Sequence, residues 1–184
     1  MKNLIILLLI IPLFAGSDYT QREQTTKSKV YDYLNNLNYP YLTDDIKARY
    51  TDVICRNSIK YRLNAMHLAR QIHAESTFKW WAGNKIAFGA MGIRPKYWSH
   101  LLYKVDPNLI EYLDTKESHI KYLKRIGYNI EIGSHILRYY LDRNDDDYRL
   151  ALISYWAGMN SKQYKRAKKK LAYYYDNQYV NKIL

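Results

Sequence analysis

Apolar side chains recur along much of this chain at steps of three and four residues, the spacing that gathers them on one face of an α-helix. The clearest stripe lies within residues 64–75, where Ala65, Leu68, Ala69 and Ile72 repeat at i, i+3, i+4 and i+7. No segment alternates between apolar and polar residues as a half-buried strand does, and no internal repeat is evident. The pattern therefore predicts a mostly α fold.

Capping residues mark the ends of further predicted helices. Thr43 stands before two aspartates as an N-cap, and Gly158 is expected to end a helix that begins at Tyr148. Gly127 is expected to end another helix in the same way. A buried helix should contain Gly133, whose missing side chain would let a neighbouring backbone approach closely. Helices are predicted over residues 45–57, 64–75, 109–113, 117–126, 129–141 and 148–158, with a short one near Pro95 and a basic one from Ser161 onward.

The N-terminus has the composition of a secretory signal peptide. A positive end is followed by an apolar run over residues 4–14 and by small residues, after which we expect cleavage at Ser17. The run is shorter than the roughly 20 residues of an ordinary membrane span, so cleavage leaves no stable span, and an uncleaved anchor is the alternative. The next segment is polar, and we expect it to be flexible to about Lys29. The predicted divisions are a signal peptide (1–17), a polar leader (18–44) and one folded domain (45–184).

The chain of 184 residues carries a formal charge of +12, which favours an anionic partner. For a protein exported to the periplasm or cell wall, the anions at hand are wall polymers and acidic lipid head groups, and nucleic acid is the competing partner. Four tryptophans and 21 tyrosines add flat amphipathic surfaces that suit sugar rings as well as a protein core. The single cysteine, Cys55, permits no internal disulfide and is interpreted as a buried small hydrophobe.

Glu75 follows Ile72 by three residues and Leu68 by seven, so helix geometry places it on the apolar face of its helix. A carboxyl group there loses hydration when it is charged, which raises its pKa above the ordinary value of about 4.3. A general acid needs such a shift to keep its proton near neutral pH. The alternative is a solubilising charge that turns outward at the end of the helix. An irregular, largely covered loop is predicted beyond it, from Ala82 to Pro95.

Four short motifs occur in order around and after this acid. They are Glu-Ser-Thr-Phe at 75–78, Gly-Ala-Met-Gly-Ile at 89–93, Asn-Ile-Glu-Ile-Gly at 129–133 and Leu-Ala-Leu-Ile-Ser-Tyr-Trp-Ala-Gly at 150–158. In this order and spacing they resemble the soluble lytic transglycosylase catalytic domain, a lysozyme-like family that is similar to goose-type lysozyme. The resemblance covers about residues 45–160. It implies a single helical domain with a substrate groove.

The resemblance further implies that Glu75 is the catalytic acid and base at the bottom of that groove. It implies that peptidoglycan glycan strands are cleaved between N-acetylmuramic acid and N-acetylglucosamine with formation of a 1,6-anhydro sugar, without a metal or an organic cofactor. Tyr155 is expected near the carboxyl group. The implied substrate-binding residues are Ser76, Gly89, Ala90, Met91, Ile93, Tyr155 and Trp156.

Two positions depart from the family pattern. Arg94 and Pro95 stand where the family usually has a Met-Gln pair, and Trp156 stands where it usually has asparagine. Ordinary glycoside hydrolysis uses two carboxylates, whereas this sequence presents one acid in the candidate core. Hydrolysis by water and a non-catalytic wall-binding protein on the same fold are the alternatives. The other nearby acids are interpreted as solvated charges: Asp106, Glu111, Asp114 and Glu117.

The remaining patterns favour neither a metal site nor nucleic-acid binding. The basic run over residues 165–170 is accompanied by no nucleic-acid motif, and we interpret it as a solvated helix face that anionic wall polymer attracts. We expect a monomer, which could work within a cell-envelope assembly. The histidines form no HExxH pair and no cluster at metal-ligand spacing; they are His67, His73, His100, His119 and His135.

Overall fold

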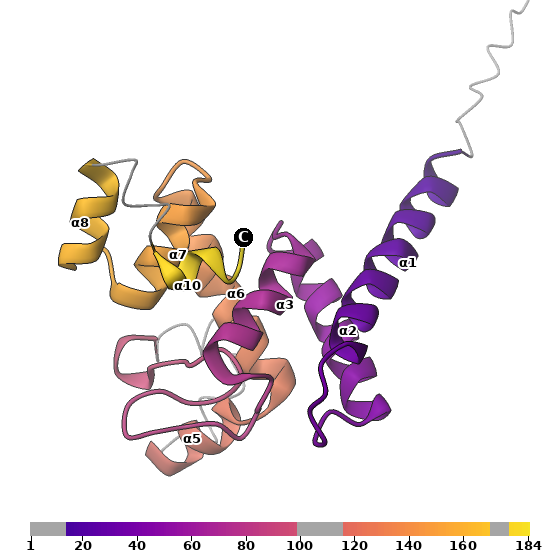
Figure 1. Cartoon of the computed structure of the whole chain (residues 1–184), viewed down its shortest axis with the longest axis horizontal. Helices are drawn as coiled ribbons and strands as arrows, with labels where there is room; N and C mark the ends of the chain where they lie inside the picture. The colour runs from indigo at the N-terminus through magenta and orange to yellow at the C-terminus, as the bar shows by residue number, and fades with distance from the viewer. Residues whose placement is uncertain (1–13, 99–115, 170–176) are drawn as a thin grey trace, which may run out of the picture.

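The computed structural model describes residues 14–98, 116–169 and 177–184. Its regular elements in these ranges are helices, which confirms the mostly α prediction (Figure 1). None of the described helices is both long enough and apolar enough to cross a membrane. Most of the predicted signal peptide and the helix predicted over residues 109–113 lie outside the described residues. The helices are α1 (Phe14–Asn35), α2 (Asp44–Lys60), α3 (Ala65–Ser76), α5 (Lys116–Leu123), α6 (Ile126–Asp142), α7 (Tyr148–Ala157), α8 (Lys162–Lys169) and α10 (Gln178–Asn181).

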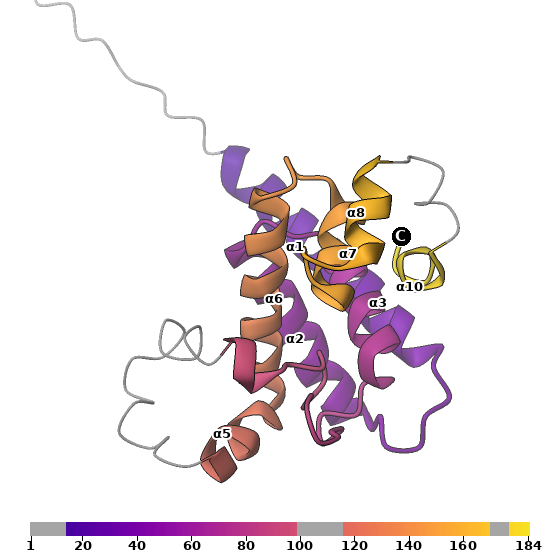
Figure 2. The same ribbon diagram turned by 90° about the vertical axis from the view of Figure 1, so that its left-hand side faces the viewer.

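Helix α1 occupies the segment that we expected to be a flexible polar leader, so that expectation is wrong. Val30 and Leu34 near its C-terminal end are fully buried, and the helix packs against α2 and α3 (Figures 1 and 2). The polar half continues from this anchored end. It is supported by an ion pair four residues apart, with Glu23 Oε1 3.3 Å from Lys27 Nζ. The packed unit therefore begins well before residue 45.

Helices α2 and α3 begin close to their predicted positions because capping side chains satisfy their first backbone N–H groups. Thr43 Oγ1 accepts a hydrogen bond from Ile46 N at 3.5 Å. Asn64 Oδ1 accepts one from Met66 N at 2.9 Å. The stripe of α3 that the sequence predicts is buried.

The predicted helix end at Gly127 is wrong. Helix α5 ends earlier, at Leu123, and Gly127 lies in the first turn of α6. A glycine ends a helix by adopting a positive φ angle, and Gly127 does not. Ile126 and Ile130 are both buried on the same side of α6, so the helical register runs through the glycine.

The C-terminal part folds back onto the helical body. Asp147 Oδ1 caps α7 by accepting from Leu150 N at 3.0 Å, and Gly158 ends that helix with φ +83°, as predicted. The basic terminal segment contains two described helices, α8 and α10, rather than one. Helix α10 contacts α7, and Val180 and Ile183 are fully buried.

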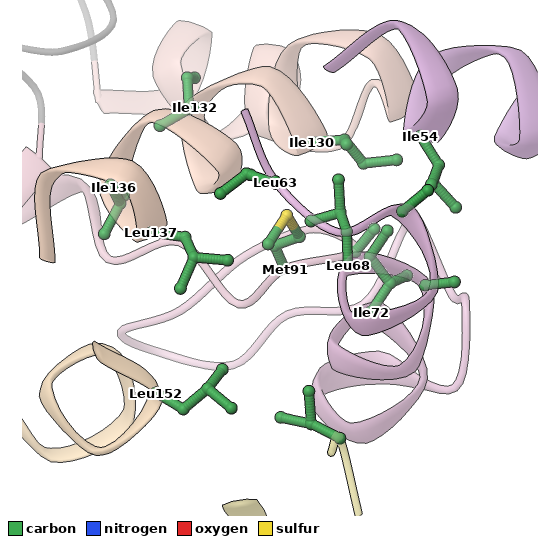
Figure 3. Packing of buried hydrophobic residues seen from close by; sticks show 14 of the residues in the cluster. Ile54, Leu63, Leu68, Ile72, Met91, Ile130, Ile132, Ile136, Leu137 and Leu152 are labelled. Atoms are coloured by element: carbon green, nitrogen blue, oxygen red, sulfur yellow. The ribbon is translucent and has the colours of Figure 1, made fainter. Parts of the chain in front are cut away.

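Met91 lies at the centre of the core, between apolar side chains of α3 and α6 (Figure 3). Gly133 on α6 makes room for it, because a Cβ atom at Gly133 would lie 2.9 Å from Met91 Cβ and closer to its sulfur. The close approach that the sequence predicts at Gly133 is therefore made by a side chain and not by a backbone.

Candidate functional site

The turn that follows α3 is held in place by two tyrosine hydroxyls. Thr77 and Phe78 both have positive φ angles, and this left-handed pair ends the helix directly after Ser76. Tyr41 Oη donates to Thr77 O at 2.7 Å, and Tyr50 Oη donates to Phe78 O at 2.8 Å. The end of α3, whose last turn carries Glu75, is thus anchored by hydrogen bonds to the two residues that follow it.

The loop at residues 89–93 is held by one buried side chain of α6. Asn129 Oδ1 accepts from Met91 N at 2.6 Å, and Asn129 Nδ2 donates to Phe88 O at 2.9 Å and to Leu123 O at 2.8 Å. Gly89 has a φ of +79°, and a Cβ there would collide with Asn129. The amide therefore fixes the path of the loop past the end of α3.

The predicted loop at 82–95 is covered only in its second half. Residues 83–86 are exposed, whereas Ala90, Met91 and Ile93 are buried. Two isolated bridges, Gly83 to Phe88 and Phe88 to Ile93, close the turn between these halves. Ala90 and Met91 accordingly support the site from within the core instead of presenting side chains to a ligand.

The carboxyl group of Glu75 is enclosed by groups from two other parts of the chain. Tyr179 Oη on α10 donates to Glu75 Oε1 at 2.6 Å. Gly92 lies against the other oxygen, since a Cβ atom at Gly92 would be 2.8 Å from Glu75 Oε2. Gln71, one turn earlier on α3, donates from Nε2 to Tyr179 Oη at 3.5 Å. The acid thus faces inward, on the apolar side of its helix, as the spacing predicts.

Burial raises the pKa of Glu75 above its ordinary value, in the predicted direction. The hydrogen bond from Tyr179 and the positive charge of Arg94 both lower that pKa, and they oppose the burial only in part. Burial and the nearby Glu75 raise the pKa of Tyr179 well above its usual range, so Tyr179 keeps its proton as the donor. The site therefore favours the protonated carboxyl group more than water does, and it also provides a hydrogen-bond partner when the group is ionised.

Two adjoining pockets open beside this carboxyl group. The first, the acid pocket, has a volume of about 50 Å³, and Glu75, Gly92 and Ile93 are in its lining. The second, the aromatic pocket, has a volume of about 730 Å³. They share Arg94, Trp98, Tyr155 and Trp156, and the aromatic pocket adds Tyr97, Tyr139 and Tyr140.

The residues of the last motif lie at the acid pocket in different ways. Tyr155 lines the pocket, as expected, but its hydroxyl donates to Met91 O at 2.9 Å rather than to the carboxyl group. Trp156 is 42% exposed and stacks on Tyr179, with ring centroids 6.0 Å apart and planes 20° apart. Ser76 is in the lining of neither pocket, and its hydroxyl donates to Ile72 O at 3.2 Å within α3.

No second acid lines either pocket among the described residues. Glu131, from the third motif, pairs with Lys60 elsewhere on the surface, and Glu117 is exposed. The other candidate acids that the sequence suggested lie outside the described residues: Asp106, Glu111 and Asp114.

His73 lies on another side of α3 from Glu75, where Tyr33 Oη is 2.7 Å from its Nδ1 and Tyr39 Oη is 2.9 Å from its Nε2. Both ring nitrogens are therefore occupied in packing α3 against the N-terminal segment. Within residues 14–98, 116–169 and 177–184, no group of three or more His, Cys, Asp or Glu side chains is arranged to hold a metal ion.

Three residues of the site were missed in the sequence. Gln71 precedes Glu75 by four residues, and this spacing could have identified it. Gly92 lies inside a recognised motif, but its contact with the carboxyl group leaves no local trace. Tyr179 is 104 residues from Glu75, and no sequence pattern indicated its contact with the acid.

Comparison of the chain with protein-family models, with curated proteins and with solved structures finds no match.

Proposed function

We propose that this protein is a lytic transglycosylase that cleaves the β-1,4 bond between N-acetylmuramic acid and N-acetylglucosamine in peptidoglycan. The setting of Glu75 carries the proposal, because a partly buried carboxyl group with a raised pKa lies beside a pocket lined with aromatic rings. Such a group holds its proton to a higher pH than an exposed glutamic acid does, and it can protonate an oxygen atom that enters the acid pocket. The motif resemblance and the helical fold support a lysozyme-like domain.

In the proposed reaction, Glu75 first gives its proton to the glycosidic oxygen as the bond to the muramyl anomeric carbon breaks. The carboxylate that results then takes the proton of the muramyl 6-hydroxyl, whose oxygen attacks the same carbon. The products are a 1,6-anhydro-muramyl end and a free 4-hydroxyl group on N-acetylglucosamine. The attacking hydroxyl belongs to the substrate, so its effective concentration is high and neither a second carboxylate nor a positioned water is required.

Tyr179 suits both halves of this cycle. Its hydroxyl donates to Glu75 Oε1 at 2.6 Å and leaves Oε2, on the side of Gly92, to exchange the proton. A charge-assisted hydrogen bond strengthens when Glu75 becomes a carboxylate, which stabilises the state formed after proton donation. The aromatic pocket supplies flat surfaces on which sugar rings of the strand stack. Together the two pockets form the proposed substrate groove.

Two alternatives keep the same site. Hydrolysis, as in a lysozyme, needs water in place of the 6-hydroxyl and is less favoured because no second acid lines either pocket among the described residues. A wall-binding protein without activity would use the exposed Trp156 but has no need of a carboxyl group with a raised pKa. A nucleic-acid binder would rely on the basic face of α8 and leave Glu75 without a role.

We also propose that the protein works outside the cytoplasm, in the periplasm or cell wall, where peptidoglycan lies. The apolar N-terminal run and the formal charge of +12 support this location and an anionic polymer as partner. We further propose that the protein works as a monomer.

The test is digestion of purified sacculi, with the released muropeptides analysed by mass spectrometry. We expect products that end in 1,6-anhydro-muramic acid, each one water lighter than the product of hydrolysis. Glu75→Gln should retain the fold by circular dichroism and lose nearly all turnover.

Products with reducing ends and no anhydro sugar would show that the protein is a hydrolase and not a transglycosylase. Undiminished cleavage by Glu75→Gln would remove the acid from the mechanism. Intact sacculi together with salt-sensitive binding to labelled oligonucleotides would favour the nucleic-acid alternative.

A further inference from the structure

Arg94 is a positive charge at the junction of the two pockets. It lies directly after the buried Ile93, so its backbone is fixed while its side chain is exposed, and it lines both the acid pocket and the aromatic pocket. No other cation lines either pocket within the part of the chain that the structure describes.

Arg94 also has no ion-pair partner among the described residues, a property that it shares with several other cations of the chain but not with those at the ion pairs. Arg138, for comparison, pairs with Asp142 at 2.7 Å and with Asp146. The described lining of the aromatic pocket contains no acid, and Glu75 is the single acid in that of the acid pocket. Glu75 takes its hydrogen bond from Tyr179, so Arg94 remains available to a ligand.

A guanidinium group in such a place is suited to one kind of ligand group. Its planar N–H donors match the two oxygens of a carboxylate, and a hydrogen bond between charged groups is stronger than one between neutral groups. The neighbours Trp98, Tyr155 and Trp156 supply flat faces to the sugar that would carry this carboxylate.

We propose that Arg94 binds a carboxylate of the glycan strand beside the bond that is cleaved, and so selects acidic peptidoglycan over neutral chitin-type glycans. This inference rests on the proposed function, and it names the substrate feature that the site recognises. Two sources supply the same chemistry: the lactyl carboxylate of muramic acid in strands without stem peptides, and the carboxylates of the stem peptide in strands that carry one. Chitin oligomers have neither.

The test measures binding separately from cleavage. In a Glu75→Gln background, which should bind without turnover, Arg94 is changed to Gln, and dissociation constants are measured by calorimetry for three ligands. These are peptide-bearing glycan strands, strands freed of peptides by an amidase, and chitin oligomers. Arg49→Gln is the matched control. Arg49 is exposed on α2 and lines neither pocket, and its substitution removes the same charge as Arg94→Gln does.

We expect Arg94→Gln to weaken binding of at least one acidic ligand by about 10- to 150-fold, the range for a hydrogen bond to a charged group, and to leave chitin binding unchanged. Arg94→Lys should retain part of the affinity, since it keeps the charge but loses the planar fork. Arg49→Gln should have no effect on any ligand.

The three ligands separate the two sources. A loss for amidase-treated strands identifies the lactyl carboxylate, and a loss confined to peptide-bearing strands identifies a stem-peptide carboxylate. Equal losses for all ligands including chitin, or unchanged affinity for both acidic ligands, would overturn the proposal. Failure of the wild-type protein to cleave sacculi is a different result, because it refutes the proposed reaction while the binding data still decide what Arg94 recognises.

Discussion

Removal of the Tyr179 hydroxyl should destabilise the protein in a way that depends on pH. The substitution Tyr179→Phe deletes the 2.6 Å hydrogen bond to Glu75 and keeps the ring that stacks on Trp156. A hydrogen bond to a charged group contributes about 1.5–3 kcal/mol to stability. In a domain of this size, 1 kcal/mol shifts Tm by about 2–4 °C. We therefore expect Tm to fall by about 3–12 °C where Glu75 is ionised.

The sign of the pH dependence follows from the direction of the Tyr179 effect. This bond lowers the pKa of Glu75, so it is stronger with the carboxylate than with the protonated acid. Below about pH 4 the carboxyl group is protonated whether the chain is folded or unfolded, and the loss of the hydroxyl should be small. The difference in Tm between wild type and variant should then grow as the pH rises through the raised pKa of Glu75.

Tyr155→Phe is the matched control, because it deletes the same hydroxyl from a bond to a neutral acceptor, Met91 O, at 2.9 Å. Such a bond contributes about 0.5–1.5 kcal/mol, so we expect Tm to fall by about 1–6 °C at every pH from 4 to 8. The assay is thermal unfolding followed by circular dichroism across this range. Equal and pH-independent losses in the two variants would refute the assignment of Tyr179 as a partner of the ionised acid.

Four substitutions test the site and its support. Gly92→Ala should lower the free energy of unfolding by about 1–2 kcal/mol, since φ is +59° there. It should also strongly reduce turnover on sacculi, because the added Cβ pushes the Glu75 carboxyl group aside. Unchanged turnover would contradict that contact. Glu75→Gln should gain Tm relative to wild type as the pH rises from 4 to 8, because the amide avoids ionisation of a buried acid, whereas a constant difference would argue that the carboxyl group is solvated. Gly133→Ala should lower the free energy of unfolding by about 1–3 kcal/mol in chemical denaturation, because the added Cβ overpacks Met91. A Cβ at Gly127 would have nothing within 4 Å, so Gly127→Ala should raise the free energy of unfolding by about 0.5–1 kcal/mol. Similar effects of the two substitutions would contradict the packing at Gly133.

The helices could be predicted from the sequence where short-range signals agreed. Thr43 and Asp147 both act as the N-caps that their residue types indicate, and Gly158 ends its helix with a positive φ. Gly127 and the polar part of α1 show where such signals fail. A glycine continues a helix when buried residues on both sides keep the register, and a polar segment becomes helical when one end is anchored in the core.

The candidate site was predictable in part. The spacing of Glu75 after Leu68 and Ile72 predicts an inward-facing acid with a raised pKa, and both features are found. Periodicity could not predict that the Ser76 hydroxyl would donate a hydrogen bond within its own helix. Nor could it tell that Met91 would fill the space above Gly133. Both depend on which neighbours occupy the adjacent space.

The sequence by itself determined where the capped helices α2, α3 and α7 begin and which face of α3 carries the acid, because these follow from interactions between residues at most a few positions apart. Only the tertiary structure decided what meets that acid. Packing of α10 beside α3 supplies the Tyr179 hydroxyl, and the loop held by Asn129 brings Gly92 to the carboxyl group and Arg94 to the pocket beside it. Such contacts join distant parts of the chain through a shared core, so no local pattern records them.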